Sequence, residues 1–222
     1  MRSVIFANGV LNHSGNALKL LNPRDLIIAA DGGAGHCLAM GIKPGVAIGD
    51  FDSLSPDHLN RLKETGTEII RHPVRKDFTD LELALKLAVD RGADEILILG
   101  ALGRRWDMTI ANIFMLAAPI LVQTQVRIVD DFQEIILLCE MKPHSIHGRA
   151  GDTLSLVPLS EDVQGITLGG LEYPLQDDIL KFGATRGISN VLVNDTATIY
   201  FKQGQLLCIL TRTNRKEITS RW

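Results

Sequence analysis

Acidic side chains follow several predicted strands of this 222-residue chain. Asp31 follows "LIIAA", and Asp50 and Asp52 follow "VAI" with only Phe51 between them. In an open α/β sheet, ligands bind beyond the carboxyl ends of the strands. Asp50 and Asp52 would face the same side if the chain were extended there. Carboxylates held close together repel one another unless a cation lies between them, and the pair therefore predicts a Mg²⁺ site.

Glycines and an arginine are expected at the same edge of the sheet. Gly32 and Gly33 follow Asp31, while Gly100, Gly103 and Arg105 follow "EILIL". Glycines let backbone N–H groups approach an anion closely, and arginine offers a planar fork to phosphate oxygens. With the carboxylates, these residues suit magnesium–nucleotide phosphoryl chemistry, in which the protein positions the groups and stabilises their charge.

Structural explanations remain open for several of these residues. Asp52 could shape the turn into the following helix. Thr79 and Glu82 have the spacing of a capping box, and Asp107 could be the N-cap of a helix over "MTIANIFMLAA". The convergence of several such groups at one edge favours a functional site over these separate explanations.

Two further patterns point to other classes of protein. "GAGHCL" (33–38) approaches the dinucleotide fingerprint of an oxidoreductase, but Leu38 occupies the third glycine position. His144 and His147 have a spacing typical of metal ligands, although they lie in a predicted linker without further ligands. The chain has no GxxxxGK[ST] motif, which disfavours a P-loop kinase.

The first part of the chain alternates apolar runs with amphipathic segments. Helices are predicted over 55–66, where Ser55 can act as N-cap, and over 79–92, which Gly92 ends. The strands are continuously apolar, as expected for a parallel sheet that helices cover on both faces. We therefore predict a doubly wound α/β domain over 1–141. Its strands are expected at 4–7, 26–30, 46–48, 68–71, 95–99 and 126–130.

The pattern changes after a predicted linker, "KPHSIHGRAGD" (142–152). Short β-rich segments follow, separated by Gly, Asn and Asp, and "KQG" (202–204) reads as a hairpin turn. These features predict a smaller all-β domain, a sandwich, over 142–222.

Composition excludes several classes of protein. A net charge of −3 argues against a nucleic-acid binder, and no stretch reaches the ~18 apolar residues of a membrane span. The three cysteines show no paired spacing, so we expect neither a disulfide framework nor a thiolate zinc site. The N-terminal "MRSVIFANG" does not resemble a signal peptide, and a cytoplasmic protein is expected.

The motifs taken in order resemble the thiamine diphosphokinases, also called thiamine pyrophosphokinases. "ADGGAGHCLAMGIKPGVAIGDFDSL" resembles that family's DGGAN, GI-x-P and GDFDS motifs, and "KDFTDLELAL" is close to a family segment. "GALGRRWDMTIANI" resembles G-x-x-G-G-R-x-D-H-x-x-x-N. "GLEYPL" and "GISN" resemble motifs of the family's β domain.

The resemblance implies transfer of a diphosphoryl group from ATP to the hydroxyl of thiamine, giving thiamine diphosphate and AMP. It also implies a homodimer whose active sites lie between the subunits. Tyr173, Ser189 and Asn190 match the family's thiamine pocket. The catalytic residues are then expected to be Asp50, Asp52, Asp80 and Asp107, of which the first three would bind Mg²⁺, and the ATP-binding residues Asp31, Gly32, Gly33, Thr79, Gly103 and Arg105.

The chain departs from the family pattern at four positions. Gly35 replaces an Asn, Arg104 a Gly, Met108 a His or Gln, and Val191 a common Glu. Met108 removes a hydrogen-bonding group beside Asp107. Two alternatives therefore stay open: a diphosphokinase for another heterocyclic alcohol such as a hydroxymethylpterin, and a non-catalytic protein that binds a nucleotide or thiamine.

Overall fold

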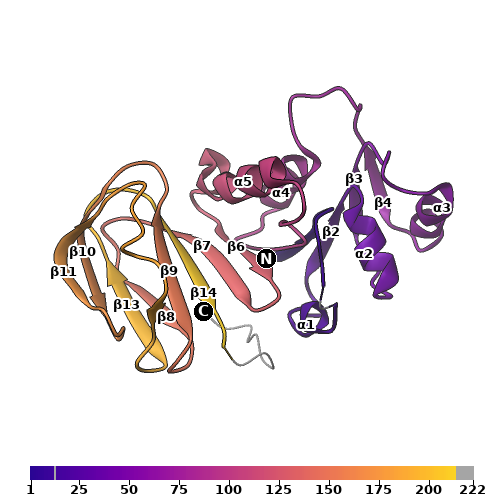
Figure 1. The fold of residues 1–222 in the computed structure, drawn as a ribbon. Coiled ribbons are helices and arrows are strands. Elements are labelled where there is room, and N and C mark those ends of the chain that lie inside the picture. Colours follow the sequence, from indigo (N-terminus) through magenta and orange to yellow (C-terminus); the bar gives the residue numbers. More distant parts are fainter. Residues whose placement is uncertain (13, 214–222) are drawn as a thin grey trace. The chain divides into compact units, whose positions relative to one another are not determined.

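The computed structural model describes residues 1–12 and 14–213 and divides into two compact units (Figure 1). Unit 1 is Met1–Asp131, and unit 2 begins at Phe132. The units divide earlier than the predicted boundary between 141 and 142. The reason is β7 (Gln133–Leu138), which pairs along its whole length with β14 (Leu206–Thr211) of unit 2.

Unit 1 contains a parallel sheet with the strand order β6-β5-β1-β2-β3-β4. The central strands β1 and β5 are buried at every residue after the first, because helices cover both faces, which explains their continuous apolar runs. All six predicted strands are confirmed. Their bounds are β1 (Arg2–Phe6), β2 (Leu26–Ala30), β3 (Val46–Gly49), β4 (Glu68–Arg71), β5 (Glu95–Leu99) and β6 (Gln125–Asp130).

The helices of unit 1 begin where the sequence supplies caps. The Ser55 hydroxyl accepts a hydrogen bond from the His58 N–H (3.3 Å), and the Thr79 hydroxyl accepts one from the Glu82 N–H (3.1 Å), as predicted. The predicted N-cap at Asp107 is wrong, because α5 begins at Trp106 and Arg105 occupies the N-cap position. The bounds are α1 (Ser14–Lys19), α2 (Gly33–Ala39), α3 (Pro56–Glu64), α4 (Asp80–Asp90) and α5 (Trp106–Phe114), followed by the 3₁₀ turns η1 (Met115–Ala117) and η2 (Pro119–Leu121).

The strand order reverses direction between β1 and β5. From β1 the chain steps to β2, β3 and β4 on one side, and it then crosses back to β5 and β6 on the other. Right-handed crossovers therefore place α2 and α3 on one face of the sheet and α4 and α5 on the opposite face (Figure 1). The gap between the ends of β1 and β5 is the topological switch point, where open α/β sheets bind ligands.

Unit 2 is a sandwich of two antiparallel sheets, as predicted. One sheet has the order β12-β9-β14-β7 and the other the order β11-β10-β13-β8. Leu154 and Leu210 of the first sheet share a core with Ile166 and Ile199 of the second. The remaining bounds are β8 (His144–His147), β9 (Thr153–Pro158), β10 (Val163–Gly169), β11 (Leu175–Leu180), β12 (Asn190–Val191) and β13 (Thr196–Tyr200).

Two predictions for unit 2 are wrong. The predicted linker contains β8, which pairs with β13, so His144 and His147 are strand residues. Their rings contact the Cys139 carbonyl (2.7 Å) and the Thr196 hydroxyl (3.1 Å). "KQG" is not a hairpin turn, because β13 and β14 on either side of it belong to different sheets.

None of the helices in the described parts of the chain is long and apolar enough to cross a membrane.

Candidate active site

A pocket of unit 1 lies at the switch point. The loops after β1 and β5 are tied together, because the Gly9 N–H donates to the Gly100 carbonyl and the Val10 N–H to the Leu102 carbonyl, each at 2.7 Å. Polar side chains converge on this pocket, which suits a small polar ligand. Its walls include Asn8, Gly9, Asp31, Ser53, Asp80, Gly103, Arg104, Arg105, Met108, Thr109 and Asn112.

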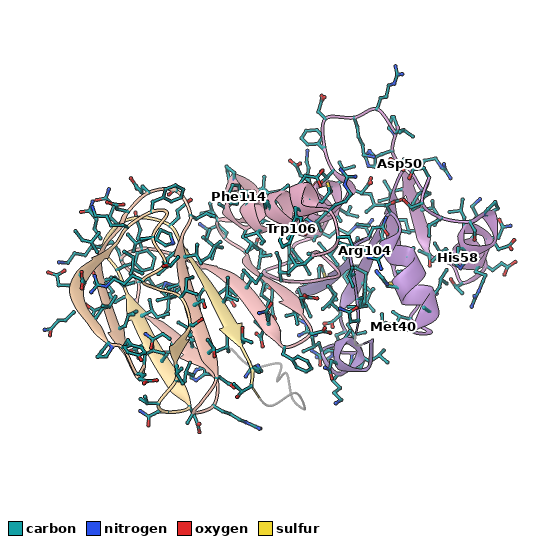
Figure 2. The ribbon with its side chains drawn as sticks, viewed as in Figure 1. Met40, Asp50, His58, Arg104, Trp106 and Phe114 are labelled. Atoms are coloured by element: carbon teal, nitrogen blue, oxygen red, sulfur yellow. The ribbon has the colours of Figure 1, made fainter. Side chains whose placement is uncertain are left out.

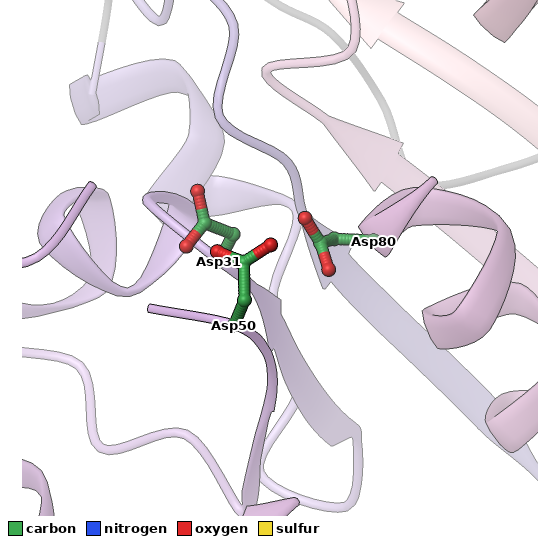
Figure 3. Close-up of side chains that lie close together, drawn as sticks. All are labelled: Asp31, Asp50 and Asp80. Carbon is green, nitrogen blue, oxygen red and sulfur yellow. The ribbon is translucent and has the colours of Figure 1, made fainter. Parts of the chain in front are cut away.

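Three carboxylates gather beside this pocket, and we call them the acid cluster: Asp31, Asp50 and Asp80 (Figure 3). One oxygen of each lies within 4.8 Å of the others. Asp31 follows β2, Asp50 follows β3, and Asp80 is the first residue of α4. Neighbouring parallel strands end at the same edge of the sheet, so residues far apart in sequence meet here.

Asp52 does not belong to the acid cluster. The sequence analysis assumed extended chain from Asp50 to Asp52, but Phe51 has a φ of 64° and the chain turns there. The Asp52 N–H donates to Asp50 Oδ1 (3.1 Å), and the exposed Asp52 carboxylate accepts from the Ser53 hydroxyl (3.1 Å). Asp31, which the sequence analysis assigned to ATP, occupies the third position instead.

Lys76 bridges two members of the acid cluster. Its Nζ lies 3.0 Å from Asp50 Oδ2 and 2.9 Å from Asp80 Oδ1. Burial raises the pKa of Asp50, but the hydrogen bonds from Lys76 and the Asp52 N–H outweigh burial and lower it. Burial raises the pKa of Asp80 and prevails over the attraction to Lys76. Burial lowers the pKa of Lys76, and its close contacts with the Asp80 and Asp50 carboxylates raise it further than that.

The acid cluster fits a hard divalent cation. Asp31 is only 6% exposed, and its buried Oδ1 has no hydrogen-bond partner among the described residues. A cation could pair with this oxygen. Asn8 Nδ2 donates to Asp31 Oδ2 (3.3 Å) and to the Ser53 hydroxyl (3.3 Å), which orients that carboxylate. A donor set made only of oxygens suits Mg²⁺ rather than a softer metal.

The glycines serve the packing of the chain more than anion binding. A Cβ on Gly33 would overlap the Phe6 carbonyl oxygen, and one on Gly32 would overlap the Asn8 side chain. Gly100 combines a φ of 65° with a close approach to the Ala7 carbonyl. The Gly103 N–H donates to the Thr109 hydroxyl (3.1 Å). Gly103 also lines the pocket, and its predicted role at ATP stays a prediction.

Arg105 and Asp107 form an exposed pair at the start of α5. Arg105 Nη2 lies 2.5 Å from Asp107 Oδ2, and this hydrogen bond lowers the pKa of the Asp107 carboxyl. Arg105 lines the pocket together with Arg104, whereas Asp107 is neither in the pocket wall nor in the acid cluster. Thr79 caps α4 and thereby fixes the backbone of Asp80.

The residues predicted for thiamine lie together in unit 2. Asn190 brackets the backbone of Tyr173: its Oδ1 accepts from the Tyr173 N–H (3.0 Å) and its Nδ2 donates to the Tyr173 carbonyl (2.8 Å). Ser189 has a φ of 59°, and its N–H donates to the Ser155 hydroxyl (3.0 Å). Asn190 is buried, and the Tyr173 side chain it supports is 64% exposed.

Known proteins match the chain over both units. Two family models match it, "Thiamin pyrophosphokinase, catalytic domain" over residues 17–129 and "Thiamin pyrophosphokinase, vitamin B1 binding domain" over residues 142–206. The thiamine pyrophosphokinase of Bacillus subtilis is 32% identical over 209 residues, which cover 92% of this chain and 96% of that protein.

The chain belongs to the thiamine pyrophosphokinase family.

Solved structures of the family share its fold. A crystal structure of the Bacillus subtilis thiamine pyrophosphokinase has a TM-score of 0.86 at 29% identity, covering 96% of this chain and 99% of that one. One from Geobacillus thermodenitrificans has a TM-score of 0.83 at 27% identity, covering 96% and 99%.

The structure shows the surroundings of three of the departures from the family pattern. Gly35 lies in α2 with nothing within 4 Å of a Cβ, so the family's Asn would also fit there. Arg104 lines the pocket, where a further positive charge suits phosphate groups. Met108 also lines the pocket, and its thioether adds an apolar surface to the wall.

Three residues of the site received no role from the sequence: Asn8, Lys76 and Asn112, the last of which is the final Asn of the quoted segment "GALGRRWDMTIANI". Asn8 could have been found by the rule that found Asp31 and Asp50, because it follows the predicted strand "VIFA". Lys76 lies inside the quoted segment "KDFTDLELAL", but nothing in that segment indicates that its side chain returns to the acidic groups. Asn112 is buried and donates to the Ala101 carbonyl (2.5 Å), which holds α5 against the loop after β5.

Proposed function

We propose that this chain is a thiamine pyrophosphokinase that transfers a diphosphoryl group from ATP to the hydroxyl of thiamine, giving thiamine diphosphate and AMP. The observation that carries the proposal is the acid cluster, which lies beside the pocket at the switch point of the sheet. Polyphosphate transfer needs positioning and charge compensation more than covalent chemistry, and this arrangement offers both. Membership of the family supports thiamine as the acceptor.

Asp31, Asp50 and Asp80 would hold Mg²⁺ in this proposal. When bound, the ion would neutralise charge on the phosphates of ATP. The chain's own residues prepare the site: Asn8 orients Asp31, and the lowered pKa keeps Asp50 ionised. Asp52, predicted as a third ligand, is held by Ser53 and is left as a residue of the surrounding loop.

The remaining pocket residues would bind the nucleotide and move a proton. Arg104 and Arg105 line the pocket as permanent cations that can contact phosphate oxygens. The thiamine hydroxyl must lose its proton when it attacks the β-phosphorus. A carboxylate of the acid cluster would accept this proton.

The thiamine-binding residues would be Tyr173, Ser189 and Asn190. The Tyr173 ring is exposed. The face of an aromatic ring attracts a cation, so this ring could bind the positively charged thiazolium of thiamine. The side-chain amide of Asn190 hydrogen-bonds with the backbone of Tyr173 and with the Val191 N–H (2.9 Å). Its role would therefore be to position the Tyr173 ring. This role differs from direct contact with the substrate.

We further propose a homodimer whose active sites lie between the subunits. The helix α5 exposes Trp106, Ile110 and Phe114, which follow one another at intervals of four residues and so share one face. Trp106 and Phe114 are labelled in Figure 2. Contact between water and such an apolar stripe is energetically unfavourable. The stripe therefore favours burial against another protein surface. A second copy is the occupant that the family resemblance favours.

The alternatives raised by Met108 and Val191 are less well supported. A hydroxymethylpterin acceptor has no support among the relatives, whose names all specify thiamine. A non-catalytic binder would have no need of three convergent carboxylates. A cytoplasmic location agrees with three free cysteines, Cys37, Cys139 and Cys208, since a reducing compartment keeps thiols unpaired.

Phosphorus NMR of the purified protein with ATP, magnesium and thiamine tests the proposal. AMP together with a new diphosphate ester is the expected product pair. Formation of ADP would mean transfer of a single phosphoryl group and would contradict the proposed chemistry. Intact ATP with thiamine, but AMP formation with a hydroxymethylpterin, would contradict the proposed acceptor.

A further inference from the structure

Lys76 occupies the place between carboxylates that a metal ion needs. Its Nζ lies 3.0 Å from Asp50 Oδ2, 2.9 Å from Asp80 Oδ1 and 3.3 Å from the Pro73 carbonyl oxygen. The side chain is only 12% exposed. The ammonium therefore has oxygen neighbours from three segments of the chain, as a bound cation would.

We propose that Lys76 is a resident cation of the acid cluster which a divalent metal displaces, and that its freed ammonium then pairs with the polyphosphate of the nucleotide. The inference rests on the proposed function in one respect, namely that the pocket binds a metal and a nucleotide together. It assigns to Lys76 a positioning role before the ligands arrive and a phosphate contact afterwards.

Charge and coordination favour the exchange. One ammonium compensates only part of the charge of three carboxylates, and it reaches Asp50 and Asp80 but not Asp31. Asp31 Oδ1 is buried without a hydrogen-bond partner among the described residues. A divalent ion carries twice the charge and takes six or more oxygen ligands, so it can use the oxygen that Lys76 leaves unpaired.

The loop that carries Lys76 can release it at small cost. The residues from Pro73 to Phe78 are all exposed except Lys76, and Val74 and Phe78 are 67% and 52% exposed. A segment with so few buried contacts opens with a low free energy. Four methylene groups give the ammonium the reach to follow a phosphate placed beside the acid cluster.

Titration of Mn²⁺ into nucleotide-free protein, with free Mn²⁺ read by electron paramagnetic resonance, tests the exchange. Lys76→Met removes the competing cation, so we expect Mn²⁺ to bind on the order of tenfold more tightly, within the range of typical coupling free energies. Lys76→Arg keeps the charge and should not gain affinity to this extent. Lys86→Met, an exposed position on α4, is the charge-matched control and should bind Mn²⁺ like the wild type.

Lysine acetylation followed by mass spectrometry tests the same exchange in the unaltered protein. Lys76 should be protected without metal, reactive with Mn²⁺, and protected again when Mn²⁺ is added with α,β-methylene-ATP, whose α–β linkage resists transfer. A Lys76 whose reactivity does not change with Mn²⁺ would overturn the proposal, even if Lys76→Met failed to fold. Equal Mn²⁺ affinities of wild type, Lys76→Met and Lys86→Met would overturn it as well.

These measurements separate the inference from the proposed function. Neither uses thiamine or product formation, so a different acceptor would leave both results intact. Loss of the protection by α,β-methylene-ATP alone would overturn the phosphate contact. A protein that made thiamine diphosphate but showed no exchange at Lys76 would retain its function and lose this inference.

Discussion

Asp50 is the residue on which the proposed metal site depends most directly. Lys76 and the Asp52 N–H keep its pKa low, so its carboxylate is charged and ready to bind a cation. Asp50→Asn removes this charge with little change in size. We expect turnover to fall by more than the ~10- to 100-fold that loss of a second-shell partner costs at metal sites. AMP formation from ATP and thiamine measures the effect.

The matched control is Asp90→Asn. Asp90 is exposed at the last turn of α4, where a negative charge opposes the helix dipole, so its loss should leave the fold and the activity unchanged. Circular dichroism should show both variants folded. Wild-type turnover by Asp50→Asn would rule out Asp50 as a metal ligand.

The three cysteines should differ in reactivity. Burial raises the pKa of the Cys37 thiol to about 12 and raises that of the fully buried Cys208 as well, whereas Cys139 is exposed. The thiolate is the reactive form, so at pH 8 a maleimide should label Cys139 in the native protein and all three cysteines after denaturation. Mass spectrometry of the labelled protein counts the thiols. Rapid native labelling of Cys37 or Cys208 would mean that unit 1 or unit 2 opens easily.

The sequence predicted which residue types gather at the site more reliably than which individual residues do. The rule of strand ends, which needs only the order of strands and polar residues, pointed to Asp31 and Asp50, and the family resemblance pointed to Asp80. Asp52 was chosen over Asp31 as a ligand because the pattern D-x-D was treated as extended chain. A positive φ at a residue such as Phe51 depends on its packing and leaves no mark in a single sequence.

At the scale of elements, the helix α2 contains two glycines with different surroundings, Gly33 and Gly35. A side chain has no room at Gly33 but has room at Gly35. Gly33→Ala would drive a Cβ into the Phe6 carbonyl of β1, which is backbone and cannot move aside. We expect the free energy of unfolding to fall by ~1–3 kcal/mol, the usual cost of overpacking. Urea denaturation measures it.

Gly35→Ala in the same helix provides the control. A Cβ there meets nothing within 4 Å, and alanine is favoured over glycine in a helix, so stability should rise by up to ~1 kcal/mol. If both variants were destabilised alike, the close approach of Gly33 to β1 would not be the cause. Activity of Gly33→Ala should fall as well, since α2 starts two residues after Asp31.

Elements with local signals were predictable, and those that depend on distant partners were not. Ser55 and Thr79 mark the starts of α3 and α4 by their own hydrogen bonds with nearby N–H groups, so the sequence was sufficient there. The strand β8 lies within "KPHSIHGRAGD", whose polar composition resembles a linker, and it forms a strand because β13 pairs with it. "KQG" has the composition of a tight turn, but the strands beside it join separate sheets.

At the scale of the molecule, the order of domains followed from the sequence, but the border between the units did not. The change from helical to β-rich segments after residue 142 predicted an all-β sandwich after the α/β domain, and unit 2 is such a sandwich. The strand β7 precedes that change, and it belongs to unit 2 because its neighbour β14 comes almost seventy residues later. Pairing over such a separation is set by the core of the sandwich, which composition alone does not reveal.

The proposed dimer makes a prediction that concerns two chains at once. If each active site takes its acid cluster from one subunit and its thiamine-binding residues from the other, Asp50→Asn and Tyr173→Ala impair different halves of the site. Tyr173 is exposed, so its loss should leave unit 2 folded. Coexpression of the two variants with different affinity tags would yield mixed dimers in which one of the two sites carries both changes and the other carries neither.

Coexpressed variants should then regain activity that neither has alone. Random pairing makes half of the dimers mixed, each with one intact site, so activity should recover to about a quarter of the wild-type value, as the two-fold symmetry of a dimer requires. Doubly tagged dimers purified from this mixture should reach about half. No recovery in doubly tagged dimers would place Asp50 and Tyr173 of one site on the same chain, and failure to isolate any such dimer would argue for a monomer. Introducing Trp106→Glu and Phe114→Glu into both coexpressed chains should abolish the recovery. Charges on that stripe would oppose its burial against a second copy.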